Sequence, residues 1–466
     1  MAQKGDSSKE KKVLITGLDK SFEHYKSIAA DIWSWAELGY QETLSSQRLQ
    51  QTLQDAGFTV EAGVAGIPTA FVASYGSGQP VIGILAEFDA LPGLSQEATP
   101  EKSPDPSRAN GHACGHHLFG VASVAAGIQL KEMLQNEKRN GTIRVYGTPA
   151  EEGGSGKVYM VREGLFNDVD VVLHWHPSSS NSANPSSSLA NISAKFRFHG
   201  ISAHAAGFPQ RGRSALDGVE AMNVMVNMMR EHVTPETRIH YVITDGGKAP
   251  NVVPDYAEVY YYARHPDPAE TKLIFNRMIK AAEGAALGTE TKMEYEIIGG
   301  VYNLLPVVSL AQLMYNNLSN IGGVTYTPEE IAFGEKIQTT FGLDKAPAIQ
   351  SAAEVGPFVN ESYRKGGGST DVGDVSWTVP TVGLRVATWI PGTASHSWQA
   401  VACGGTDIGY KGMMVAAKTL TATGYDLFHD QALIDKAKTE WQAAKGADFK
   451  YEALIGDRPP ALDYRE

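Results

Sequence analysis

The 466-residue sequence has few cysteines, no excess of positive charge and no long apolar run. Its two cysteines, Cys114 and Cys403, exclude a small secreted scaffold held by several disulfides and favour a reducing compartment, so we expect a cytoplasmic protein. Lysine and arginine total 40 against 52 aspartate and glutamate residues, and the resulting net charge of −12 argues against nucleic acid as a partner. No stretch approaches the roughly 18 apolar residues of a membrane span, so no membrane partner is expected either.

The remaining composition is that of an ordinary globular protein, with 42% apolar and 20% charged residues. Residues 1–12 are polar and of mixed charge, which is unlike a signal peptide or an anchor, and we expect them to be frayed. The sequence also has 13 histidines, several of them close to glycines, carboxylates and Cys114. Their positions are the informative feature.

Short apolar runs alternate with helical patterns in the first part of the chain and return near its end. The runs cover residues 81–86, 142–146, 169–173 and 380–387, and residues 118–136 have a helical pattern. Continuous runs of this kind are typical of strands that are buried on both faces of a sheet. The sequence therefore predicts an α/β fold with a mixed sheet sandwiched by helices.

Polar side chains follow each of these predicted strands. They are Glu87 and Asp89, then Glu151 and Glu152, then His174 and His176, and finally His396. Because open α/β sheets bind ligands beyond the carboxyl ends of their strands, we expect these side chains to lie close together.

The pattern changes between residues 186 and 301. Predicted strands (192–199, 238–244, 256–263 and 293–298) surround two amphipathic helices (215–231 and 268–287) in the order strand, helix, strand, strand, helix, strand. This order is the split βαβ pattern of a small α+β unit. We therefore predict a first domain in two parts, residues 1–187 and 302–466, with a second domain, residues 188–301, inserted between them.

One short stretch, residues 111–117, holds Cys114 together with His112, His116 and His117. Thiolates and imidazoles are ligands that zinc and similar cations prefer, and a neighbouring cation would keep the cysteine ionised. The alternative is a buried cysteine beside ordinary turn histidines. His112 and His117 are each expected to pack or support rather than to bind the metal.

The other candidate groups are less specific one by one. Adjacent side chains in an extended turn point to opposite sides, so one of Glu151 and Glu152 can bind a metal while the other acts as an acid or base. His174 and His176 share one face of a strand, and one ligand with one structural histidine is the preferred interpretation. Asp89 is expected to orient a ligating imidazole.

Together these motifs resemble the M20 family of metal-dependent peptidases and amidohydrolases, in particular its aminobenzoyl-glutamate hydrolase-like branch with a cysteine–histidine motif. The resemblance rests on four stretches in the same order along the chain: residues 112–116 (HACGH), 150–153 (AEEG), 173–177 (LHWHP) and 369–377 (STDVGDVSW). It implies a zinc-peptidase-like domain with an inserted ferredoxin-like dimerisation or lid domain. Many members of this branch have an aspartate where this chain has His117.

The resemblance also implies roles for individual residues. Five of them would bind two divalent metal ions, zinc or manganese: Cys114 as the bridging ligand, His116, Glu152, His176 and His396. It implies that Glu151 is the general base and that His204 of the inserted domain reaches the site of a partner subunit. Asn251 and Arg264 are implied to contact the substrate, for which a guanidinium suits a carboxylate.

The function expected from this set is hydrolysis of the amide bond of an N-acyl amino acid or a small peptide-like compound, with an aminobenzoyl-glutamate-like substrate as the first candidate. A dipeptidase or aminoacylase of the same family is the nearest alternative. A metal-binding partner subunit with little turnover of its own is a third hypothesis. We expect a homodimer, or a hetero-oligomer with a related subunit.

Overall fold

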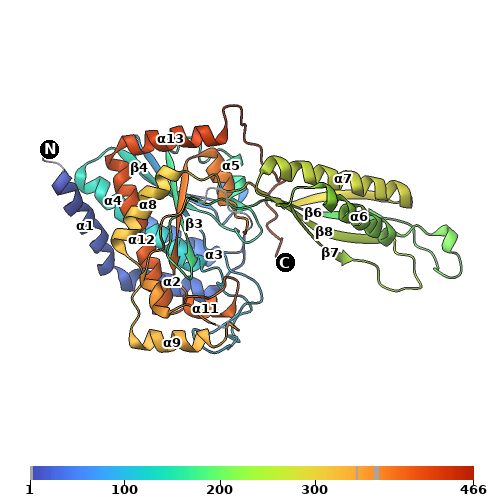
Figure 1. Cartoon of the computed structure of the whole chain (residues 1–466), viewed down its shortest axis with the longest axis horizontal. Helices are drawn as coiled ribbons and strands as arrows, with labels where there is room; N and C mark the ends of the chain where they lie inside the picture. Colours follow the sequence, from blue (N-terminus) through green and yellow to red (C-terminus); the bar gives the residue numbers. More distant parts are fainter. Residues whose placement is uncertain (1–3, 343–344, 361–366, 466) are drawn as a thin grey trace.

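The computed structural model describes residues 4–342, 345–360 and 367–465. Its named strands form two sheets, which lie at opposite ends of the elongated molecule in Figure 1. The larger sheet has the strand order β1 (Thr59–Ala62), β2 (Phe71–Ser77), β4 (Gly141–Gly147), β3 (Val81–Ala86), β5 (Val171–Ser178), β10 (Thr381–Ala387). The four strands from β4 to β10 run parallel, and β1 and β2 are antiparallel additions at one edge.

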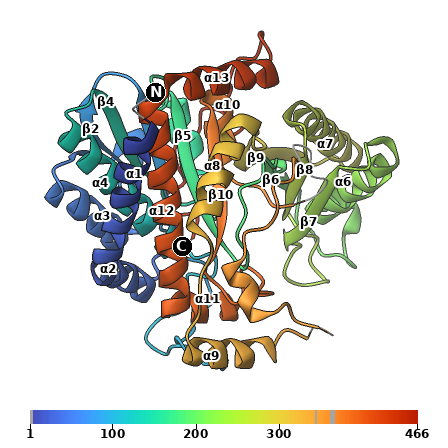
Figure 2. The same ribbon diagram turned by 60° about the vertical axis from the view of Figure 1, so that its left-hand side comes forward.

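Two long helices cover the six-stranded sheet. Helix α4 (His116–Glu137) packs against β3, β4 and β5, and α12 (Asp407–His429) packs against α4, β5 and β10. Figures 1 and 2 show α12 beside these strands, with α1 on its outer side. Strand β3 is buried along its whole length, as its run of apolar residues predicts.

Further helices surround this core. They are α1 (Lys4–Lys20), α2 (Phe22–Trp35), α3 (Thr43–Asp55), α5 (Gly156–Arg162), α8 (Val308–Ile321), α9 (Pro328–Gln338), α10 (Val372–Thr378), α11 (Trp398–Gly404) and α13 (Gln431–Lys445), with the 3-10 helices η1 (Val64–Gly66) and η4 (Ile349–Ala353). No helix in the described part of the chain combines the length and the apolarity that crossing a membrane requires.

The smaller sheet is antiparallel and has the order β7 (Arg238–Asp245), β8 (Tyr256–His265), β6 (Ala190–His199), β9 (Lys292–Val301). Helices α6 (Ala215–Met229) and α7 (Pro268–Thr289) pack against each other and against β6 and β8, and the 3-10 helices η2 (Pro209–Arg211) and η3 (Arg230–His232) belong to the same region. The predicted ferredoxin-like strand and helix order is therefore confirmed. A separate apolar core lies between this sheet and its two helices.

The structure corrects several local predictions. Residues 4–12 belong to α1 and are not frayed, while residues 1–3 lie outside the described part. The apolar residues Phe22, Tyr25, Ile28, Ile32 and Trp35 have helical spacing and predict a helix over residues 19–38, but the structure begins α2 only at Phe22, because α1 ends at Lys20. Strand β5 extends beyond the predicted 169–173, so His174 and His176 lie within it and not after it. A buried strand can include such polar side chains where it borders a ligand site.

Some elements had no clear signal in the sequence. Strand β1 lies at the sheet edge with β2 next to it, and both are partly exposed, which weakens their apolar pattern. Residues 341–368 show no periodicity in the sequence, which predicts a long loop. The structure places η4 within this stretch, and its residues 343–344 and 361–366 lie outside the described part.

Candidate metal centre and active site

The candidate site lies where the parallel strands end. Glu87 and Asp89 follow β3, and the Glu151–Glu152 turn follows β4. The turn between Gly111 and α4 brings Cys114 and His116 to the same place. Gly115 permits this turn because its φ of 76° is left-handed and a Cβ atom there would lie 2.8 Å from Pro177.

Cys114 is shared by two groups of possible metal ligands. In each group, one ligand atom per residue lies within 4.8 Å of the others: Cys114, His116 and His176 form one group, and Cys114, Glu152 and His396 form the other. The Cys114 Sγ atom lies 3.4 Å from His176 Nε2. Each of the two groups would hold one divalent cation, and Cys114 would serve both.

The donor atoms of these groups fit divalent cations of the zinc type. His116 Nε2 and Glu152 Oε1 are buried and form no well-aligned hydrogen bond among the described residues, although Glu87 Oε2 and His396 Nε2 lie 3.1 and 3.2 Å from them. Burial raises the pKa of the Cys114 thiol, so a neighbouring cation is needed to keep the thiolate. Burial also holds the pKa of His176 well below its usual range, which leaves a neutral imidazole for coordination.

Two contacts orient the histidine rings of the first group. His116 Nδ1 lies 2.8 Å from Asp89 Oδ1, and His176 Nδ1 lies 2.7 Å from the carbonyl oxygen of Pro177. With these Nδ1 atoms donating, each Nε2 lone pair faces the cluster. The second Asp89 oxygen accepts the Glu152 amide at 2.8 Å, so one carboxylate connects the histidine to the acidic turn. Burial opposes ionisation of Asp89, but His116 and the amide together hold its pKa below the usual value.

His396 reaches the cluster from the loop after β10. Its backbone amide donates to the Ala113 carbonyl at 3.0 Å, and its Nε2 lies 3.2 Å from Glu152 Oε1. The contact with Glu152 raises the pKa of the His396 imidazole. The backbone of His396 has a left-handed φ of 58°, which is costly for a residue with a side chain and is therefore held by these contacts.

Glu151 lies among acidic neighbours. One of its oxygens is within 4.8 Å of possible ligand atoms of Glu87 and His116. Burial and the nearby carboxylates of Glu87 and Glu152 hold the pKa of Glu151 well above its usual range. A cation beside it would oppose this effect and favour the ionised form that a base requires.

Three buried charged groups support this region: Glu87 and Asp371, which lie in stretches that the sequence had already pointed to, and Lys157, to which the sequence gave no role. Lys157 Nζ lies 2.7 Å from Glu87 Oε1 and 2.7 Å from Asp371 Oδ1, and all three side chains are at most 1% exposed. The other Glu87 oxygen lies 3.1 Å from His116 Nε2. The only signal in the sequence is a lysine directly before the apolar residues 158–161 of α5.

The structure does not bring every predicted residue to this cluster. His204 and Asn251 are exposed in neighbouring loops next to the four-stranded sheet, where His204 Nδ1 accepts the Ala206 and Gly207 amides at 3.2 and 3.0 Å. Asn251 contacts the same loop, since its carbonyl accepts the amide of Ala205 at 3.0 Å.

Three other histidines are held by the protein itself. His112 Nε2 and His117 Nε2 lie 3.1 and 3.0 Å from the carbonyls of Ile32 and Gly404. His174 packs on Gly383 of β10, where a Cβ atom would lie 2.3 Å from the ring. Burial lowers the pKa of both His117 and His174 to about 3, so these rings are neutral.

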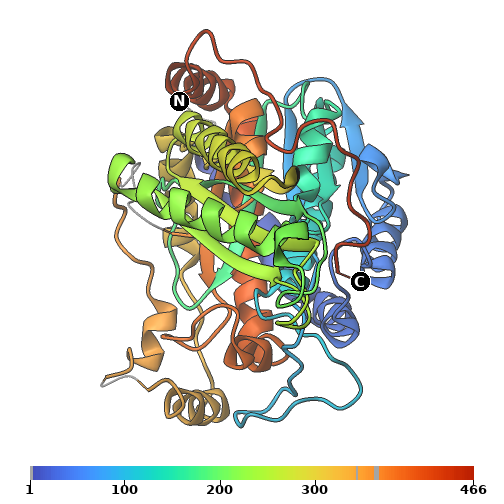
Figure 3. The same ribbon diagram turned by 90° about the vertical axis from the view of Figure 1, so that its right-hand side faces the viewer.

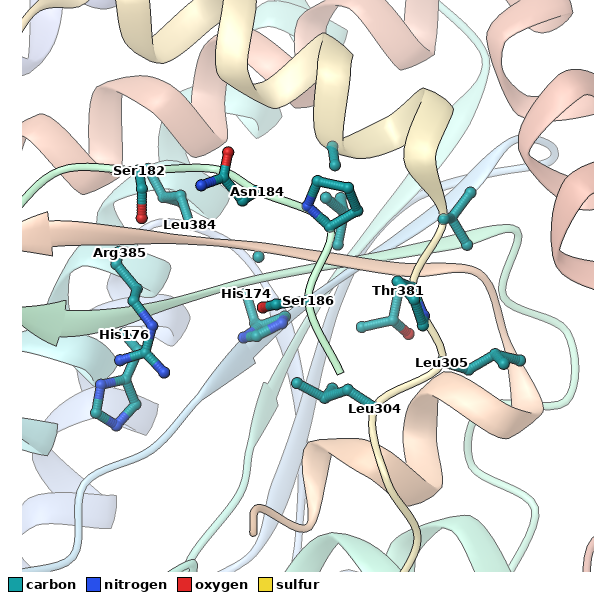
Figure 4. A pocket seen from close by; sticks show the side chains of 16 residues that line it. His174, His176, Ser182, Asn184, Ser186, Leu304, Leu305, Thr381, Leu384 and Arg385 are labelled. Atoms are coloured by element: carbon teal, nitrogen blue, oxygen red, sulfur yellow. The ribbon is translucent and has the colours of Figure 1, made fainter. Parts of the chain in front are cut away.

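Two cavities adjoin the cluster. A cavity of about 330 Å³ lies between the acidic turn and the four-stranded sheet; its lining includes Glu151, Glu152, Asn191, Arg264, Ser369, Asp371, His396 and Arg465. A cavity of about 150 Å³ lies on the other side of His176, and Figure 4 shows His174 and Arg385 on its wall with Arg385 extending toward His176.

The comparisons with known proteins agree with this geometry. Residues 190–290 match the peptidase dimerisation domain of the M20 family. The chain is 42% identical over 445 residues to the B-type subunit of p-aminobenzoyl-glutamate hydrolase from Escherichia coli (strain K12), covering 90% of this chain and 92% of the relative. The chain belongs to the M20 family. This membership makes it a hydrolase of the peptidase or amidohydrolase type.

Other M20 proteins are more distant. The Xaa-Arg dipeptidase of Mus musculus is 28% identical over 440 residues, covering 91% of this chain and 90% of the relative. A crystal structure of a dinuclear metal-binding M20 peptidase from Bacillus subtilis superposes with a TM-score of 0.58 at 17% identity, covering 88% of this chain and 99% of that one. This likeness confirms the predicted fold class.

Proposed function

We propose that this M20 protein hydrolyses the amide bond of N-acyl amino acids or small peptide-like compounds, with p-aminobenzoyl-glutamate as the first candidate substrate. The observation that carries the proposal is Cys114, which is shared by two ligand groups next to a separate carboxylate, Glu151. The identity of 42% to a component of p-aminobenzoyl-glutamate hydrolase supports the choice of substrate.

Five residues would hold two divalent cations, zinc or manganese: Cys114, His116, Glu152, His176 and His396. When bound, such cations lower the proton affinity of water and polarise an amide carbonyl. Asp89 keeps His116 in the tautomer that coordinates through Nε2.

Glu151 would move the proton. Its carboxylate accepts a proton from the attacking water and delivers it to the nitrogen of the leaving amine, which completes cleavage of the C–N bond. The buried acidic surroundings raise the proton affinity of Glu151, and this favours the accepting step once cations balance the local charge.

The inserted domain would supply the substrate contacts and the dimer interface. We assign residues 188–301 to it and residues 1–187 and 302–466 to the catalytic domain. Arg264 lines the larger cavity and suits a substrate carboxylate. His204 and Asn251 lie outside this cavity in the same chain, and we assign them to the site of the partner subunit.

The proposed dimer uses apolar side chains that are exposed on α6 and β7. They are Val224, Met225, Met228, Tyr241, Val242 and Ile243. Large apolar side chains exposed on one domain are suited to burial in an interface. We propose a homodimer; because the relatives include two different subunits of one hydrolase, a related chain is the alternative partner. Free Cys114 and Cys403 support a reducing compartment, for which we propose the cytoplasm.

A dipeptidase is the second candidate, favoured by the similarity to Xaa-Arg dipeptidase. Protein loaded with zinc or manganese, with metal content measured on the same sample, should release p-aminobenzoate from p-aminobenzoyl-glutamate faster than it cleaves a dipeptide panel. The reverse order would support the dipeptidase. Full metal occupancy with no turnover of any amide would refute both and favour a partner subunit.

The role of Glu151 is tested by the same assay. Glu151→Gln should retain the metal and lose at least 100-fold in kcat, since general acid–base catalysis contributes about 10²–10⁴-fold. Glu335→Gln, an exposed position on α9, is the matched control and should keep full activity. Unchanged kcat in Glu151→Gln would exclude it as the base.

A further inference from the structure

The segment after α13, residues 446–465, crosses from the six-stranded sheet to the four-stranded sheet and returns to the acidic turn. Figures 1 and 3 show it in dark red, passing from α13 to the junction of the two sheets. We call residues 446–465 the C-terminal strap. It has no regular secondary structure, so its path depends on side-chain contacts.

Contacts with both parts of the molecule hold the strap. On the larger part, Arg162 donates to the carbonyls of Gly456 and Arg458 at 3.0 and 2.8 Å. On the inserted part, Arg458 donates to the carbonyls of Ile297 and Ile298 in β9. Nearer α13, Tyr451 donates to Asp374 at 2.8 Å, and Leu454 covers Gly300 so closely that a Cβ there would lie 2.7 Å away.

The end of the strap lies on the catalytic turn. Tyr464 and Arg465 donate to the Glu152 carbonyl oxygen at 3.0 and 2.5 Å. The Tyr464 ring packs edge-on against Tyr40 at 5.5 Å, and Tyr40 donates to the Gly154 carbonyl at 2.6 Å. One nitrogen of the Arg465 guanidinium is therefore used by the turn, while Arg465 also lines the 330 Å³ cavity.

Several polar atoms around this cavity have no partner. Asn191 Oδ1, Arg264 Nε, Ser369 Oγ and Arg465 Nε are buried atoms of lining residues that form no hydrogen bond among the described residues. Leaving such atoms unpaired is unfavourable, so a cavity lined by them is suited to a polar ligand. Two of the four atoms belong to guanidinium groups, which come from two separate elements of the cavity wall: β8 and the strap.

We propose that Arg465 of the strap binds a carboxylate of the substrate and, with Arg264, makes the site selective for amides of acidic amino acids. The inference rests on the proposed amidohydrolase function. Each guanidinium can donate two parallel hydrogen bonds to one carboxylate, so two of them match the two carboxylates of glutamate or aspartate.

Charge balance in the cavity supports this assignment. Two carboxylates, those of Glu151 and Glu152, line the same cavity and would repel a doubly negative substrate, whereas Asp371, also in the lining, is paired with Lys157. The two guanidiniums supply the compensating positive charge. The corresponding amide of glutamine has nearly the same shape but lacks the second carboxylate. One of the two guanidiniums then has no carboxylate to bind.

The experiment compares N-benzoyl-glutamate with N-benzoyl-glutamine on the metal-loaded enzyme and on Arg465→Ala, Arg465→Lys and a control, Arg48→Ala. Arg48 of α3 pairs with Asp31 of α2 on the surface. In Arg465→Ala we expect kcat/KM for the glutamate substrate to fall about 10- to 100-fold, mainly through KM, and for the glutamine substrate to change less than about 3-fold. Arg465→Lys should recover part of the loss, and Arg48→Ala should match the wild type.

An equal fall for both substrates would overturn the inference, because a residue that only holds the Glu152 turn affects every substrate alike. If the wild type cleaves neither substrate, the proposed function is refuted, and the role of Arg465 is then tested by measuring the binding of amino acids. Calorimetry with L-glutamate and L-glutamine then supports it if glutamate binds more tightly and Arg465→Ala removes the difference. Equal binding of the two amino acids by the wild type overturns it.

Discussion

The buried lysine beside the metal centre offers the sharpest test of how this fold is held together. Replacing Lys157 with methionine keeps the length and the apolar stem of the side chain but removes its charge. Glu87 and Asp371, each 2.7 Å from Nζ and at most 1% exposed, then lose their shared cation. Glu87 retains His116 at 3.1 Å, whereas the pairing of Asp371 with Nζ has no replacement among the described ion pairs.

The magnitude follows from the cost of neutralising one buried carboxylate. At about 1.4 kcal/mol for each pH unit above an ordinary aspartate pKa of about 4, protonation at pH 7 costs about 4 kcal/mol. Breaking a buried ion pair by removing one partner costs about 3–5 kcal/mol, which agrees with this value. We therefore expect Lys157→Met to lower the free energy of unfolding by about 4 kcal/mol at pH 7.

The loss should depend on pH with a definite sign. Burial raises the pKa of Glu87 and Lys157 opposes this effect, so without the lysine the folded variant holds a proton that the unfolded chain releases above about pH 4, and the stability of the variant falls as the pH rises from 4 to 7. By the same arithmetic the deficit relative to wild type shrinks to about 1.4 kcal/mol at pH 5. Adding Asp371→Asn removes the charge while keeping an acceptor for the Lys157 backbone amide, and it should recover at least half of the loss at pH 7.

Equilibrium urea unfolding of the metal-free proteins, followed by tryptophan fluorescence at pH 5 and pH 7, measures these differences. A loss below 1 kcal/mol at pH 7, or a deficit that is the same at both pH values, would refute the electrostatic reasoning. A double variant that is less stable than Lys157→Met would also contradict it.

Three further predictions concern packing, pH and association. Gly383→Ala places a Cβ atom 2.3 Å from the His174 ring and should lower the free energy of unfolding in urea by about 1–3 kcal/mol. Gly288→Ala, in open space on α7, is the control and should not lower it. Equal effects of the two changes would contradict the packing argument. His117 is buried and neutral, with a folded pKa of about 3, so it contributes stability that is complete above pH 6.5 and is lost toward pH 3 by up to about 1.4 kcal/mol per pH unit. His117→Asn should therefore flatten the fall in the free energy of unfolding between pH 6 and pH 5. An unchanged slope would exclude this role. Val242→Lys on the exposed face of β7 should shift the protein from dimer toward monomer in sedimentation velocity, and an unchanged dimer would exclude this face as the interface.

Much of the fold could be predicted because it follows local patterns. The apolar runs at β3 and β4 and the strand and helix order of residues 190–301 are present in short stretches of sequence. Strands β1 and β2 were not predicted, since a partly exposed strand has a weak apolar pattern. His174 and His176 were expected after a strand and lie within β5, because periodicity alone cannot show where a buried strand ends.

The sequence by itself determined which residue types could form the metal centre. Cysteine, histidine and glutamate occur in short motifs next to strand ends, and chain connectivity of an α/β sheet brings such ends together. Only the tertiary structure decided the partners of Lys157 and the position of Arg465, which lies 313 residues from Glu152 along the chain yet contacts its carbonyl. The physical reason is that a local pattern records burial and periodicity, whereas the pairing of distant charged groups depends on how the whole chain packs.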